Sequence, residues 1–331
     1  MSKARGLADL GNVYDDGALS NRNMVVNGSC NVAQRGTSQT TEGYGSIDRM
    51  ILSLSGATAT MTQETLALGQ TDLPSQFRKF ARIATTTGNN NCGLLHRIED
   101  VDTAEGEVTL SFYAKGTNPV SGSFDVFLYQ GFGSGGSTGV KTTVQSLTLT
   151  SSWQRFEFVF TLASLSGKTI GTGSNLEIDI VQPNADTGTS AWTLDITGVQ
   201  LEVGDTATPF EHPRSYSDEL ARCQRYAFRL GGTQYGVFGN GGGANATTAV
   251  ITIKTPVTMR ALPSLTTGGT LFINDTNAAF IVTSSSISSA YSSPDSVQVN
   301  PVASSGITQY RPMRFGQGND STAFLLFDAE L

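Results

Sequence analysis

The chain has 331 residues, of which 38% are hydrophobic and 15% are charged, and its formal net charge is −7. This acidic balance excludes attraction to a nucleic-acid backbone by counterion release. The apolar content and low charge density argue against a disordered chain. The chain contains 37 glycines and many serines and threonines, which favour strands and turns over long helices. We therefore expect an all-β protein that is long enough for two domains.

The first 22 residues show no sustained hydrophobic period. They combine a few apolar residues with several turn formers, so they are not expected to form a core of their own. We expect an N-terminal arm, residues 1–22, that docks onto a larger assembly through Leu7, Leu10, Val13 and Tyr14. The arm lacks the apolar core of a signal peptide, and no run approaches the roughly 20 apolar residues of a membrane span. Synthesis in a cytoplasm without membrane insertion is the expectation.

Apolar residues that alternate with polar ones dominate residues 23–211. A period of two is typical of strands with one buried face. Glycine-rich turns separate these runs, and many short strands joined in this way predict an antiparallel β-sandwich of the jelly-roll type. The buried faces are predicted at Val108, Leu110, Phe112 and Ala114; Phe124, Val126 and Leu128; Phe156, Phe158 and Phe160; Leu176, Ile178 and Ile180; and Trp192, Leu194 and Ile196.

A short linker helix is predicted at residues 212–230. Ser215 and Asp218 fit a capping box, and the glycines at 231 and 232 would end the helix. One apolar stripe either packs on its own domain or contacts copies of itself in a homotrimer. The second arrangement would stabilise a helix that is too short to be stable alone. The residues of this stripe, and thus of the candidate trimer interface, are Leu220, Cys223, Ala227 and Leu230.

Residues 231–331 repeat the β pattern and predict a second, smaller β-sandwich, the C-terminal tip domain. Several aromatic residues lie in or beside its loops, where flat rings could stack on sugars. Arginine adds forked donors that suit carboxylates or sugar hydroxyls. The candidate ligand-binding residues are Tyr235, Phe238, Tyr291, Tyr310, Arg311 and Arg314. Singly, each is also compatible with a half-buried edge position or an interface ion pair.

Catalytic patterns occur in the chain without the context that catalysis needs. Residues 135–139 match GxSxG, but they lie in a glycine-rich loop and not at a strand-to-helix turn. The carboxylates within residues 99–105 read as a solvated acidic turn, because sequence alone cannot place two carboxyls at glycosidase spacing. We therefore expect no enzyme and no catalytic residue.

Metal and redox sites are also not expected. His96 and His212 are too far apart for metal-ligand spacing. The chain has three cysteines, which have no CxxC spacing and are expected to be reduced. We expect no cofactor. Loop carboxylates and carbonyls of a β-sandwich suit Ca²⁺, but no DxDxDG-type run is present.

A series of short motifs runs through the first two thirds of the chain. It begins with NMVVNG at 23–28 and AQRGT at 33–37, followed by Asp48-Arg49. It continues with SFYAKG at 111–116, WQR at 153–155 and GVQLEVGDTATPFEHPRSYSDELARCQRY at 198–226. Together these motifs resemble bacteriophage tail-fibre and virion structural proteins, notably those of marine and cyanobacterial phages. Met50 is a departure, because the family usually has an aromatic residue there.

The resemblance implies a homotrimeric virion component, assembled in the host cytoplasm, with a carbohydrate-binding-like jelly roll. It implies a receptor-binding tail fibre that attaches the particle to host cell-surface glycan by non-covalent, multivalent binding. The N-terminal arm would contact other phage tail or virion proteins, and the tip domain would face the host. The alternative is a purely structural head-fibre or capsid-decoration protein. A polysaccharide depolymerase is disfavoured, because the sequence lacks the regular repeats of a β-helix.

Overall fold

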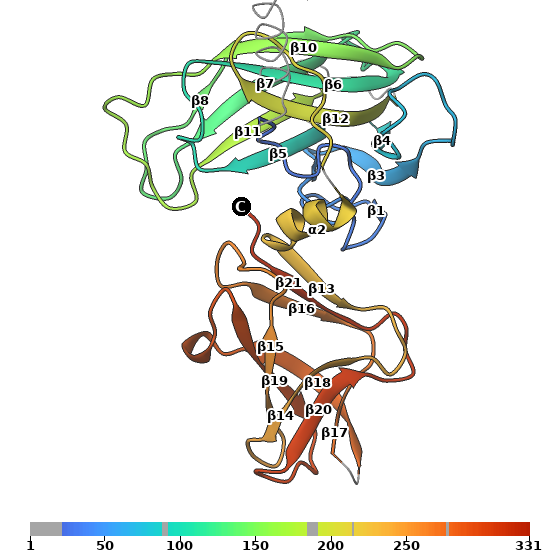
Figure 1. Ribbon diagram of the computed structural model, residues 1–331, viewed down its shortest axis with the longest axis vertical. Coiled ribbons are helices and arrows are strands. Elements are labelled where there is room, and N and C mark those ends of the chain that lie inside the picture. Colours follow the sequence, from blue (N-terminus) through green and yellow to red (C-terminus); the bar gives the residue numbers. More distant parts are fainter. Residues whose placement is uncertain (1–21, 88–91, 184–190, 214, 276–277) are drawn as a thin grey trace, which may run out of the picture. The chain divides into compact units, whose positions relative to one another are not determined.

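The computed structural model describes residues 22–87, 92–183, 191–213, 215–275 and 278–331 (Figure 1). The chain forms two compact units, one that ends at Glu219 and also includes Leu331, and one that spans Leu220–Glu330. The predicted all-β fold with a short helix between β-rich parts is confirmed. The predicted docking residues Leu7, Leu10, Val13 and Tyr14 lie outside the described residues. None of the described helices is long and apolar enough to cross a membrane.

The first unit is an antiparallel β-sandwich of two sheets. The first sheet has the order β1-β3-β4-β12-β6-β10. Its strands are β1 (Ser38–Gln39), β3 (Thr58–Thr65), β4 (Lys79–Thr87), β12 (Thr193–Val203), β6 (Glu107–Thr117) and β10 (Gln154–Thr161). The second sheet has the order β2-β5-β11-β7-β8, with β9 also paired to β7. Its strands are β2 (Ile51–Ser53), β5 (Gly93–Glu99), β11 (Asn175–Val181), β7 (Phe124–Gly131), β8 (Val140–Lys141) and β9 (Gln145–Leu147).

The core of this unit lies between the two sheets and contains the predicted inward faces. Leu110 and Phe112 on β6 are at most 1% exposed, and Leu176 on β11 is fully buried. Trp192 packs edge-on against Phe124, with 4.8 Å between ring centroids. The prediction of period-two strands is confirmed at these positions, because each apolar residue that alternates with a polar one points between the sheets.

The first motifs of the sequence form a polar cluster, which we define as the buried Asn27 and Asp48 and the half-buried Gln34 and Arg35. The Asn27 amide donates to the carbonyl oxygens of Val32 and Asp48, both at 2.8 Å, and accepts from the Val32 N–H at 3.0 Å. The Asp48 carboxylate accepts from the backbone N–H of Gln34 at 2.9 Å and from its side-chain amide at 2.5 Å. Arg35 Nη1 lies 3.9 Å from Asp48 Oδ1. These motif residues therefore stabilise the fold.

The helix α2 (Tyr216–Gln224) is shorter than predicted. Its predicted N-cap is confirmed, since the Ser215 hydroxyl accepts from the Asp218 N–H at 3.1 Å. The prediction of one helix through residue 230 is wrong. Strand β13 (Ala227–Gly231) pairs with β21 (Phe324–Asp328), and this long-range pairing overrides the local helical spacing.

The candidate trimer stripe therefore does not form one face of a helix. Leu220 and Cys223 are on α2, whereas Ala227 and Leu230 are on β13. Cys223 and Ala227 are fully buried within the single chain. The two are already covered by their own chain, so they cannot supply a contact between copies.

The second unit is all-β, as expected, but its strands form a closed antiparallel barrel and a small sheet in place of the expected sandwich. The barrel order is β14-β15-β19-β18-β17-β20, and the three-stranded sheet has the order β13-β21-β16. The barrel strands are β14 (Val237–Gly243), β15 (Ala249–Lys254), β19 (Ser296–Ala303), β18 (Ala279–Ile287), β17 (Leu271–Asn274) and β20 (Pro312–Gln317). Strand β16 spans Ser264–Gly268, and a 3-10 helix, η2, spans Ser289–Tyr291. Ile251, Ile273, Val299 and Phe315 are fully buried in this unit.

Candidate functional site

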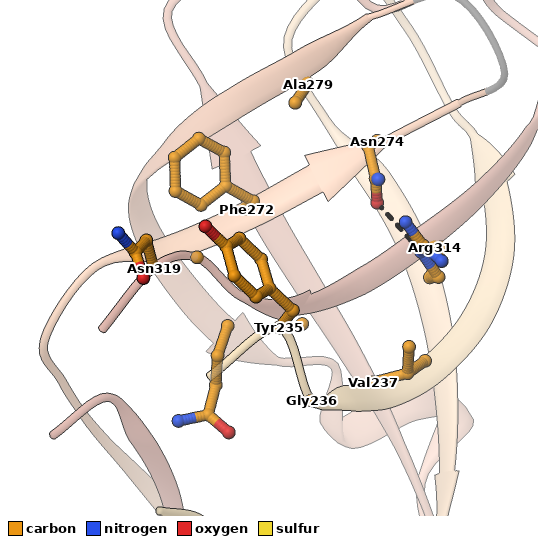
Figure 2. Close-up of a pocket in the computed structure, with 11 residues that line it drawn as sticks. Tyr235, Gly236, Val237, Phe272, Asn274, Ala279, Arg314 and Asn319 are labelled. Carbon is orange, nitrogen blue, oxygen red and sulfur yellow. Dashed lines mark hydrogen bonds between the residues drawn. The ribbon is translucent and has the colours of Figure 1, made fainter. Parts of the chain in front are cut away.

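A pocket of about 390 Å³ lies on the barrel over strands β14, β17 and β20 (Figure 2). Its volume falls within the ~300–1,000 Å³ that is common for small-molecule sites. The lining residues on these strands alternate with buried residues such as Ile273 and Phe315, so the pocket is on the outer face of the barrel. The residues that line it are Tyr235, Gly236, Val237, Phe272, Asn274, Ala279, Arg314, Gly316, Gln317, Gly318 and Asn319.

The strand register brings the main lining residues together. Phe272 on β17 is directly opposite Gly316 on β20, and Asn274 is opposite Arg314. On the other side of β20, Gly316 is opposite Val237 of β14. Directly opposite residues share one face of a sheet, so one ring and one hydrogen-bonded polar pair lie on the same surface.

Gly316 and Gly318 line the floor of the pocket, where neighbouring atoms leave no room for a side chain. A Cβ on Gly316 would lie 2.3 Å from the carbonyl oxygen of Gly236. A Cβ on Gly318 would lie 2.2 Å from the nearest ring carbon of Phe272. The Phe272 ring therefore lies directly against the chain at Gly318 and lines the pocket beside it.

Tyr235 supplies the second ring of the pocket. Its side chain is 67% exposed, and its backbone has a φ of 59°, in the left-handed region that tyrosine rarely adopts. The strained conformation is held by two hydrogen bonds, from the Tyr235 N–H to Gly318 O at 3.0 Å and from the Gly236 N–H to Thr233 O at 3.1 Å. An exposed ring in a strained turn is a common feature of functional sites.

The polar groups of the pocket differ in their availability. Arg314 Nε donates to Asn274 Oδ1 at 3.2 Å, which orients both side chains (Figure 2). Gln317 is 5% exposed, and its amide donates to Ala323 O at 2.7 Å, so it serves to hold the loop. Asn319 is exposed at the rim. The arrangement offers two rings for stacking, a guanidinium and side-chain amides for hydrogen bonds.

Two of the six predicted ligand-binding residues, Tyr235 and Arg314, line this pocket. Phe238 instead is partly buried and packs against the barrel core, with its ring 5.5 Å from that of Phe315 and nearly perpendicular to it. Arg311 forms an ion pair with Asp275 at 2.7 Å. The structure thus gives Phe238 and Arg311 structural contacts.

The other two predicted residues are exposed but lie elsewhere. Tyr291 belongs to η2 and is 75% exposed, and Tyr310 is 86% exposed. The Tyr310 N–H donates to the carbonyl oxygen of Gly243, beside the first residue of β20. The Tyr235 N–H donates to the carbonyl oxygen of Gly318, just after the last residue of β20. At about 3.3 Å per residue, the length of β20 separates the two tyrosines by roughly 20 Å.

The sequence analysis missed Phe272, Asn274 and Asn319. Phe272 and Asn274 sit in a short apolar strand whose alternation is visible in the sequence, and they occupy its outward positions. Their proximity to Arg314 depends on the pairing of β17 with β20, which are about 40 residues apart in the chain. The glycines at 316 and 318 were the sequence signal that could have indicated this site. Glycine in a strand often marks a place where another part of the chain or a ligand approaches the backbone closely, and these two follow Arg314.

The other candidate sites of the sequence analysis remain apart in the structure. No group of three or more His, Cys, Asp or Glu side chains in the described parts of the chain is arranged to hold a metal ion. The GxSxG match at residues 135–139 lies between β7 and β8, so the strand-to-helix turn of that motif is not formed there. The three cysteines are buried free thiols.

Asp179 is one of the titratable groups of the first unit whose environment shifts the pKa. It lies on the outer face of β11 beside Glu177 and is 6% exposed. Burial is the main cause that raises the pKa of Asp179 to about 8, and the negative charge of Glu177 adds to it. Lys141 and Arg97 oppose this shift. The folded protein therefore holds a proton here that the unfolded chain releases.

Replacing Asp179 with asparagine is expected to stabilise the first unit at high pH. Between about pH 4 and pH 8 the folded state binds one more proton than the unfolded state, so the wild-type free energy of unfolding falls as the pH rises. The variant lacks this loss. Its free energy of unfolding should therefore exceed that of wild type by near zero at pH 4 and by at least about 1 kcal/mol at pH 8. Urea unfolding at several pH values measures it, with the exposed Asp102→Asn as control. A variant less stable than wild type at pH 8 would contradict the assignment.

No protein-family model matches the chain, and no curated protein sequence matches it. Among solved structures, a CBM4 structure is 19% identical and has a TM-score of 0.27, with 37% of this chain and 82% of that chain covered. The family 11 carbohydrate-binding module of Lic26A-Cel5E from Clostridium thermocellum is 14% identical, with a TM-score of 0.30 and coverage of 53% and 98%. The enzymatically active domain of tailspike protein 4 from bacteriophage CBA120 is 13% identical, with a TM-score of 0.30 and coverage of 54% and 21%. Likenesses at this level do not identify a ligand for this chain.

Proposed function

We propose that this protein binds a sugar unit of a surface glycan in the barrel pocket, without chemical conversion. The observation that carries the proposal is the pairing of two rings, Tyr235 and Phe272, with the hydrogen-bonded side chains of Asn274 and Arg314 around one glycine-floored pocket. A sugar ring has apolar faces that stack on aromatic rings and hydroxyls that pair with planar polar side chains. The pocket offers both kinds of contact on one surface.

We propose further that the protein is a receptor-binding component of a virion, as its sequence motifs suggest. A single shallow pocket would bind a glycan weakly, and several copies on one particle would raise the avidity. Contacts of the N-terminal arm with other virion proteins and assembly into a homotrimer belong to this proposal. Its support is the resemblance of the motifs. In addition, a surface with few charged groups limits the electrostatic repulsion between identical copies.

An array of bacterial surface polysaccharides tests glycan binding at this pocket. Wild-type protein should bind some members, and Phe272→Ala should lower that binding at least about fivefold, since loss of a stacked ring costs roughly 1 kcal/mol or more. Tyr291→Ala is the matched control, because Tyr291 is an exposed ring of the same unit outside the pocket. Equal binding by wild type and the Phe272 variant would contradict the proposed site.

A further inference from the structure

The lining of the barrel pocket carries one charged side chain, that of Arg314. The other described residues that line it are aromatic, aliphatic, glycine or amide residues. No carboxylate is among them, although the chain as a whole has a net charge of −7. A lone guanidinium within a hollow creates a local positive potential that attracts an anionic group.

The neighbouring arginine, Arg311, has an acidic partner, whereas none of the described residues neutralises the charge of Arg314. Arg311 Nη1 contacts Asp275 Oδ2 at 2.7 Å, and the Asp275 side chain is 2% exposed. Among the residues described by the structure, Arg314 has no acidic partner within ion-pair distance. Its Nε donates to Asn274 Oδ1 at 3.2 Å, so the guanidinium is oriented while Nη1 and Nη2 make no hydrogen bond to a described residue. Within the described parts of the chain, Arg314 is therefore oriented by Asn274 and has no acidic partner.

We propose that the sugar unit bound in this pocket carries a carboxylate, as hexuronic acids do; this inference rests on the proposed function. Two N–H groups of a guanidinium match the two oxygens of a planar carboxylate in parallel hydrogen bonds. The sugar ring then stacks on Phe272 and Tyr235, and the exposed amide of Asn319 reaches hydroxyls at the rim. Arg314 selects the charge, the rings hold the sugar, and Asn274 positions the guanidinium.

The variants of Arg314 separate charge from geometry. Arg314→Gln should lower the affinity for an acidic glycan at least about tenfold, the usual size of a charge-assisted bidentate contact. Arg314→Lys should retain part of the affinity, because lysine keeps the charge but loses the fork. Asn274→Ala should reduce the preference for acidic glycan without changing net charge. Lys254→Gln is the control, since Lys254 is an exposed cation of the same barrel outside the pocket.

The inference is tested on an array that carries each bacterial polysaccharide in two forms, native and with its carboxyl groups reduced to alcohols. The array also carries phosphorylated polysaccharides that have no carboxylate. Binding confined to native carboxylated members, lost on reduction and in Arg314→Gln but kept in Lys254→Gln, supports the inference. Equal binding to reduced or phosphorylated members, still lowered by Phe272→Ala, overturns the inference and leaves the proposed function standing. Binding to no member overturns both.

Discussion

Replacing Asp48 with alanine is expected to lower the free energy of unfolding of the first unit by about 3 kcal/mol or more. The Asp48 carboxylate is fully buried and accepts two hydrogen bonds from Gln34. It also lies 3.9 Å from Arg35 Nη1, whose side chain is 4% exposed. The alanine variant would leave these donors buried beside a small cavity, and buried donors without an acceptor cost much more than the bond itself contributes.

The unfolding of this unit can be followed selectively because both tryptophans of the chain, Trp153 and Trp192, lie within it. Urea unfolding monitored by tryptophan fluorescence therefore reports the effect of Asp48→Ala without interference from the barrel. Asp102→Ala is the control, since Asp102 is exposed and should change the free energy of unfolding by less than about 0.5 kcal/mol. If the two variants proved equally stable, the polar cluster would not have the structural role assigned here.

Replacing Tyr235 with glycine is expected to abolish most glycan binding without loss of stability. The ring is 67% exposed, so its removal sacrifices little buried area. Glycine adopts the φ of 59° freely, and relief of this strain should leave the barrel as stable as wild type or more stable by up to about 1 kcal/mol. Binding should fall at least about tenfold, because one of the two stacking surfaces is lost.

Two readouts separate binding from folding in this variant. Hydrogen exchange of the barrel strands measures stability, and the polysaccharide array measures binding. Tyr291→Ala removes another exposed ring and should change neither. A Tyr235→Gly variant that binds as wild type does would show that the strained turn has no part in recognition. If the variant lost binding only because the barrel unfolds, the barrel strands would exchange faster than in wild type.

The strands of the first unit could be predicted because one face of each is apolar. Val108, Leu110 and Phe112 alternate along β6 and are all buried between the sheets. The burial of the polar face of the same strand was harder to predict. Ser111 on this face is also buried, at 2% exposed, and Tyr113 packs against Phe77. Loops that cover an outer sheet face leave no periodic signal, so their packing is not visible in the sequence.

The helix and the pocket show where local patterns are insufficient. Ala227 and Leu230 have helical spacing from Cys223, but pairing of β13 with β21, about 100 residues later, makes them part of a strand. Likewise, Tyr235 and Arg314 could be selected by residue type, whereas Phe238 is also aromatic but packs, partly buried, against the core. Only strand register decides which of these residues share a face and which point inward.

The central claim is that a glycan is held in the barrel pocket, and hydrogen exchange with and without a polysaccharide selected on the array tests it most directly. The account predicts slower exchange on binding at residues 235–237, 272–274 and 314–319, which form the pocket. Strands β7 and β11 of the first unit should exchange at unchanged rates. Protection of β7 and β11 with no change in the barrel would contradict the claim and move recognition to the sandwich.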